Sequence, residues 1–72
     1  MSEEEKEWFL SLPKGMKLHL LDDMMKEGQT GMALATMKIL LDAPITKGGI
    51  STDEIKEVMD MNIAKLGKSK NN

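Results

Sequence analysis

Apolar residues recur every three to four positions in three long segments, and this helical period constrains the fold more than any other feature. Leu18, Leu21 and Met25 share one helix face, as do Ile55 and Met59 later in the chain. No segment alternates apolar and polar residues over the length of a strand. The sequence therefore predicts an all-α fold, a small compact bundle of three main helices plus a short N-terminal helix.

Local boundary signals define the two helices predicted in the first part of the chain. Ser2 followed by Glu5 has the spacing of a capping box, and Pro13 ends the short helix that it begins. A second helix is predicted from Lys14 or Gly15 to Glu27, and the glycine that follows is a good C-terminal stop. On this helix Lys17 is expected on the polar, solvated side.

The third predicted helix, residues 31–42, is apolar almost all round. Thr36 and Lys38 are the main exceptions. Such a helix is buried in a core or covered by a partner, so we expect it at the centre of the fold. Thr30 is predicted as its N-cap, and Pro44 places its end at the preceding residue.

The fourth helix is predicted to begin at a second capping box, Ser51 with Glu54, and to end near Leu66 before Gly67. The preceding Gly48-Gly49 pair is expected to be a flexible connection. The predicted organisation is one helical domain over residues 1–67 and a disordered C-terminal tail over residues 68–72.

Composition limits how the domain is stabilised and where it works. A 72-residue chain has a marginal core, and without cysteine it has neither disulfides nor thiolate metal sites. No apolar run approaches the roughly 20 residues of a membrane span. The acidic start Glu3-Glu4-Glu5 is unlike the positive start of a signal peptide. We expect a cytoplasmic protein without cofactors, and a homodimer is left open because the core is small.

The potential ligands and nucleophiles give no catalytic or metal-binding pattern. His19, Asp22 and Asp23 share a helix face, but a zinc site needs further ligands and an organised second shell. The Gly48-Gly49 pair lacks the following lysine and the preceding strand of a phosphate-binding loop. We therefore predict that the chain is not an enzyme. We interpret His19, Asp22 and Asp23 as part of a solvated helix face.

Nucleic-acid binding is the alternative function. The segment from Met32 to Leu66 resembles the first part of a helix-turn-helix domain, but the chain after Asp60 is too short to add a recognition helix. The net charge is −2, and all ten basic residues are lysine, so arginine contacts to guanine are excluded. A DNA-binding regulator with this truncated motif would contact phosphates through Lys47, Lys56, Lys65, Lys68 and Lys70.

Eight methionines in 72 residues are the most unusual feature of the composition. Methionine fills helical cores, and it is also over-used on adaptable binding surfaces. We therefore predict a small regulatory or adaptor protein, of the kind that phages and mobile elements use as host modulators, which binds a larger protein through an apolar helical surface. A subunit of a larger assembly is a further alternative. The predicted interface residues are Trp8, Phe9, Leu21, Met24, Met25 and Met61.

Overall fold

The computed structural model describes the backbone of residues 2–70 and the side chains of residues 2–61. Its elements are α1 (Glu3–Ser11), α2 (Lys14–Lys26), α3 (Thr30–Asp42), the short 3-10 helix η1 (Ile45–Lys47) and α4 (Thr52–Lys70). No strand occurs in the described part of the chain. The prediction of an all-α fold is therefore confirmed.

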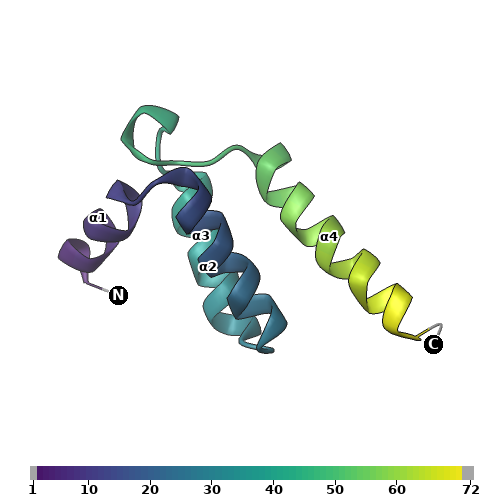
Figure 1. Ribbon diagram of the computed structural model, residues 1–72. Coiled ribbons are helices and arrows are strands. Elements are labelled where there is room, and N and C mark those ends of the chain that lie inside the picture. The colour runs from purple at the N-terminus through teal and green to yellow at the C-terminus, as the bar shows by residue number, and fades with distance from the viewer. Residues whose placement is uncertain (1, 71–72) are drawn as a thin grey trace.

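Helix α2 is the central element of the molecule. It packs against both α3 and α4, and α2 and α3 lie side by side in Figure 1. Helix α1 lies beside the start of α2, and α4 runs away from the α2–α3 pair at its C-terminal end (Figure 1). An ion pair of 2.6 Å between Lys14 Nζ and Glu54 Oε2 joins the first turns of α2 and α4.

The core is small and draws on all four α-helices. Its buried hydrophobic members are Phe9, Leu21, Ala33, Leu40, Ile50 and Ile55. Phe9 belongs to α1 and Ile55 to α4, so even the short first helix is attached by a buried ring. Burial of one such large side chain is worth about 1.5–3 kcal/mol, so each of these contacts is a large fraction of the stability of a domain of this size.

The predicted caps of α1, α2 and α4 are present. In α1, Glu5 N donates to Ser2 Oγ while Ser2 N donates to Glu5 Oε1, as a capping box requires. Ser51 Oγ accepts from Glu54 N and donates to Glu54 Oε1 at the start of α4. Gly28 ends α2 with φ of 76°, and its N–H reaches the carbonyl of Met25, as in a Schellman motif.

Two predicted boundaries differ from the structure. Thr30 is the first residue of α3 and makes no side-chain cap, because the N-cap position belongs to Gln29. Helix α4 continues through Gly67 to Lys70, since one glycine costs a helix only about 1 kcal/mol. Residues 68–70 of the predicted tail (residues 68–72) belong to this helix, and Asn71 and Asn72 lie outside the described residues, so the division into a domain over residues 1–67 and a disordered tail stays a prediction.

Helix α3 is buried on one face only. Ala33, Thr36 and Leu40 are buried against the rest of the molecule, while Leu34 and Leu41 are exposed. We expected this helix to lie at the centre of the fold and to be covered on all sides. That expectation is wrong for its outer face. The sequence marks Thr36 as one of the polar exceptions on this apolar helix. In the structure Thr36 is buried, and its hydroxyl donates to a methionine sulfur at 3.4 Å.

The connection from α3 to α4 is a packed turn, contrary to the expected flexible loop. Gly49 N donates to the Pro44 carbonyl and Ile50 N donates to the Leu40 carbonyl, both at 2.9 Å. Gly48 has φ of 93°, a conformation that costs little only for glycine. A Cβ atom at Gly48 would also clash with the carbonyl of Leu10. The turn therefore needs this glycine for both its backbone conformation and its close approach to α1.

Candidate functional site

The predicted interface residues divide into exposed and buried groups. Trp8 is 63% exposed and Met61 is 59% exposed, so both are available to a partner. Phe9 and Leu21 are 5% and 0% exposed and belong to the core. Their prediction as surface contacts is wrong, because both side chains point into the helix junction that α1 and α2 share with the rest of the molecule.

Met24 and Met25 are half-buried and pack against the core. Met24 contributes its sulfur as the acceptor of the hydrogen bond from the Thr36 hydroxyl, which joins α2 to α3. This contact gives Met24 a structural role at the α2–α3 junction. Of the interface residues predicted from sequence, only Trp8 and Met61 are thus exposed side chains, and they lie on different helices.

Trp8 lies on a helix that has side-chain hydrogen bonds near both of its ends. The capping box satisfies the N-terminus of α1, and Ser11 Oγ donates to the carbonyl of Trp8 at 2.6 Å near its C-terminus. The next residue, Phe9, is buried and anchors the helix to the core. The indole is exposed because α1 packs on the core with its other side. A partner that binds the indole therefore loses little free energy in ordering the helix.

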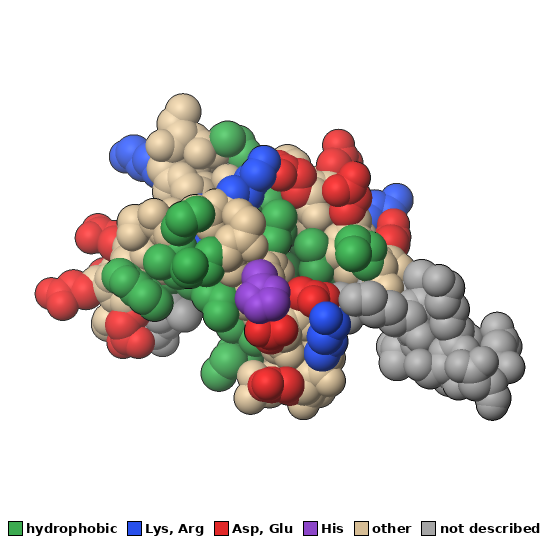
Figure 2. Space-filling model, in the orientation of Figure 1, with side chains coloured by type: hydrophobic (Ala, Val, Ile, Leu, Met, Phe, Trp, Pro, Cys, Tyr) green, Lys and Arg blue, Asp and Glu red, His purple; other side chains and the backbone are tan. Residues whose placement is uncertain are grey.

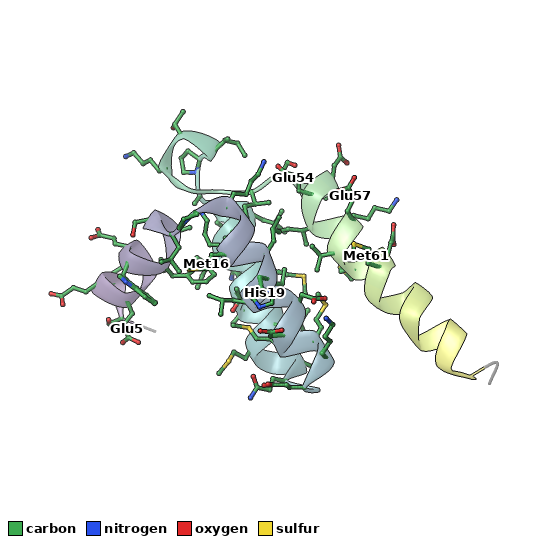
Figure 3. All side chains as sticks on the ribbon, viewed as in Figure 1. Glu5, Met16, His19, Glu54, Glu57 and Met61 are labelled. Atoms are coloured by element: carbon green, nitrogen blue, oxygen red, sulfur yellow. The ribbon has the colours of Figure 1, made fainter. Side chains whose placement is uncertain are left out.

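Hydrophobic side chains gather over α1 and the adjoining part of α2 on the face drawn in Figure 2, next to His19. Met16, which is 49% exposed, lies in this region of α2 (Figure 3). The sequence gives no reason to separate Met16 from the core methionines, because it shares helical spacing with Leu20 and Met24. Trp8 on α1 and Met16 on α2 are the exposed large hydrophobic side chains of these two helices, and we refer to the two together as the Trp8 surface.

Other exposed large hydrophobic residues lie on the remaining elements. They are Met32, Leu34 and Leu41 on α3, Ile45 on η1, and Met59 and Met61 on α4. A groove of about 500 Å³ lies between α1 and α3, and its lining includes Lys6 and Leu10 of α1 together with Lys38, Ile39 and Asp42 of α3. Sequence periodicity cannot identify this groove, because it depends on how α1 crosses α3.

Of the five lysines predicted to contact nucleic acid, the structure describes the side chains of two. Lys47 on η1 and Lys56 on α4 are exposed. The side chains of Lys65, Lys68 and Lys70 lie outside the described residues. No described arrangement brings the two placed lysines into one site.

Lys17 is the functional candidate that sequence reasoning missed. It is 3% exposed, and its Nζ donates to the carbonyls of Leu10 at 2.9 Å and Gly48 at 2.6 Å. The prediction of a solvated position is wrong because the end of α1 and the turn after α3 fold over this face of α2. The only sequence signal was its spacing from Leu21, one helical turn later on the buried face.

The charged side chains of α2 and the start of α4 lie in close pairs within the described residues. His19 Nε2 lies 3.3 Å from Asp23 Oδ2, and Asp22 pairs with Lys26 at 2.7 Å. Within the described part of the chain no group of three His, Asp or Glu side chains is placed to hold a metal ion. The pKa of Glu54 is below its usual 4.5, chiefly because Lys14 donates a hydrogen bond to its carboxylate.

The helices of the described region include none that is both long and apolar enough to cross a membrane. Comparison with known proteins gives no relative: the chain matches no protein-family model, no curated protein and no solved structure.

Proposed function

We propose that this chain is a non-enzymatic adaptor or regulator that works in the cytoplasm by binding a larger protein through the Trp8 surface. The observation that carries the proposal is the exposure of the single tryptophan on a capped helix whose neighbouring ring is buried. Tryptophan is enriched among the residues that contribute most to protein–protein binding. In this proposal the chain is one small bundle of three main helices, and the short helix α1 carries the tryptophan that binds the partner.

Three features support a protein partner. The Trp8 surface combines a rigid aromatic side chain with Met16, which is flexible and polarizable and so adapts to the shape of a partner. The first helix also carries Glu3, Glu4 and Glu7, which are exposed and would repel a nucleic-acid backbone. Met61, on α4, is a second exposed apolar contact for a partner large enough to span both helices.

The test begins with capture of the partner by the tagged full-length chain from a cell lysate, with nuclease treatment and a series of salt concentrations. The affinity of the purified partner is then measured for Trp8→Ala. Because hot-spot truncation typically costs at least about 2 kcal/mol, we expect Kd to rise by roughly thirtyfold or more. Circular dichroism should show an unchanged helix content, since the indole is exposed.

Ile45→Ala is the matched control. Ile45 is 65% exposed, so it is as accessible as Trp8, but it lies on η1. We expect this variant to bind normally. Equal losses for Ile45→Ala and Trp8→Ala, or full binding by a folded Trp8→Ala, would remove the Trp8 surface from the function. Capture that disappears with nuclease, or affinity that falls steeply with salt, would indicate nucleic-acid binding instead.

A further inference from the structure

The buried lysine of α2 carries a charge that no described carboxylate neutralises. Lys17 is 3% exposed, and both of its hydrogen-bond partners are neutral backbone carbonyls. The ion pairs of the described residues join other lysines to acids, and Lys17 is in none of them. Buried charges are usually paired with an opposite charge or hold a ligand, so this ammonium group is an unusual feature of the interior.

Lys17 also forms part of the wall of a groove. The groove has a volume of about 560 Å³ and lies where the end of α1 meets η1 and the glycine turn. Its charged lining consists of Lys17, Lys47 and Glu7, and its apolar lining includes Leu10 and Leu12. An ammonium group has three N–H donors, and the two carbonyls take two of them. One N–H of Lys17 is thus left without an acceptor among the hydrogen bonds of the described residues.

The charges and the apolar walls together define the ligand. Two lysines and one glutamate give the lining a formal charge of +1, which a single negative charge neutralises. Leu10 and Leu12 supply a surface for an aliphatic side chain, and no aromatic residue of this lining is placed to stack on a base. We propose that this groove binds the C-terminal carboxylate of a polypeptide that ends in an aliphatic residue.

In the proposed complex the carboxylate accepts hydrogen bonds from Lys17 and from Lys47, and the terminal side chain contacts Leu10 and Leu12. Such charge-assisted hydrogen bonds are stronger than those between neutral groups. Glu7 opposes binding through its charge and so keeps the site selective for a single carboxylate. The groove is lined by residues outside the Trp8 surface. This proposal therefore goes beyond the proposed function and is tested independently of it.

The test is a titration of the ¹⁵N-labelled full-length chain at low salt, followed by NMR. N-acetylleucine serves as the probe for an aliphatic C-terminus, and N-acetylleucinamide, which lacks the carboxylate, is its matched control. We expect saturable shifts of the Gly48 and Leu12 amides with N-acetylleucine and none with the amide. Dimethyl phosphate carries the same charge without the aliphatic side chain and should bind more weakly.

Two variants test the charges without disturbing Lys17, whose replacement could unfold the chain. Lys47→Ala should weaken N-acetylleucine binding about two- to fivefold, the scale of an exposed ion pair, while Lys56→Ala on α4 leaves it unchanged. Glu7→Gln should tighten binding by a similar factor. Trp8→Ala should have no effect, which separates this site from the proposed function.

Several results would overturn the inference. They are equal shifts with N-acetylleucinamide, no saturation with N-acetylleucine, or no tightening in Glu7→Gln. Dimethyl phosphate binding as tightly as N-acetylleucine would identify a general anion site and refute a preference for polypeptide C-termini.

Discussion

Replacement of Lys17 by methionine tests whether this residue holds α1 and the glycine turn onto α2. The last four carbonyls of a helix have no partner within the helix, and Leu10 supplies one of those in α1. Because α1 has no basic residue in its own last turn, Lys17 of the following helix donates to that carbonyl. The same ammonium group donates to Gly48, so one side chain joins three segments.

The size of the effect follows from opposing contributions. Each hydrogen bond from a charged donor contributes about 1.5–3 kcal/mol, and its loss leaves the carbonyls of Leu10 and Gly48 short of a donor. Methionine removes the desolvation cost of the buried ammonium group, which is several kcal/mol and offsets much of that loss. We expect Lys17→Met to lower the free energy of unfolding by about 2 kcal/mol. Since a domain of this length has about 3–5 kcal/mol in total, roughly half of its stability is at stake.

Urea denaturation and thermal melting followed by circular dichroism measure this change. For a chain of this size, about 2 kcal/mol corresponds to a decrease in Tm of about 8–16 °C. Lys56→Met is the control, because Lys56 is exposed on α4 and should change stability by less than about 0.5 kcal/mol. If Lys17→Met is as stable as the wild type, or loses no more than Lys56→Met, the two carbonyl contacts do not hold the segments together and the reasoning is refuted.

Further substitutions test local features of the fold. Gly48→Ala should cost more than about 1–3 kcal/mol, because it adds a clash to an unfavourable φ, whereas Gly31→Ala in open space on α3 should gain about 0.5–1 kcal/mol; urea denaturation compares them. Ser2→Ala should cost about 1 kcal/mol through the lost cap, with faster hydrogen exchange in the first turn of α1. Lys14→Met should return the Glu54 pKa toward 4.5 in an NMR titration. In the wild type the stabilisation by this pair is fully present above pH 4.5 and is lost as pH falls through the lowered folded-state pKa.

Local sequence signals predicted the helices well because they act within a few residues. The capping boxes at Ser2 and Ser51 depend on contacts three positions apart, and the stop at Gly28 depends on one backbone conformation. These interactions are nearly independent of the rest of the fold. The exceptions are Thr30, which was predicted as an N-cap, and Gly67, which was predicted as a C-terminal stop. Both residue types are also tolerated within a helix, where these two residues lie.

The division of apolar residues into core and surface could not be predicted in the same way. Periodicity places Leu21 and Met16 on apolar faces of α2 but does not say which face the other helices cover. Leu21 became core because α2 packs against both α3 and α4, and Met16 stayed exposed. Truncation of Leu21 would cost about 2–5 kcal/mol and unfold much of the population, so it cannot report on binding.

Lys17 shows most clearly why long-range contacts escape a local reading. Its hydrogen bond to Gly48 joins residues 31 positions apart, and it exists only because the glycine turn approaches α1 closely enough to exclude a side chain. The two residues therefore depend on each other: a Cβ at Gly48 would push the turn away and leave the ammonium group without its acceptor. A double-mutant cycle with Lys17→Met and Gly48→Ala should show losses smaller than the sum of the single ones, because either change alone already breaks the shared contact. Additive losses would mean that the lysine and the glycine stabilise separate parts of the fold.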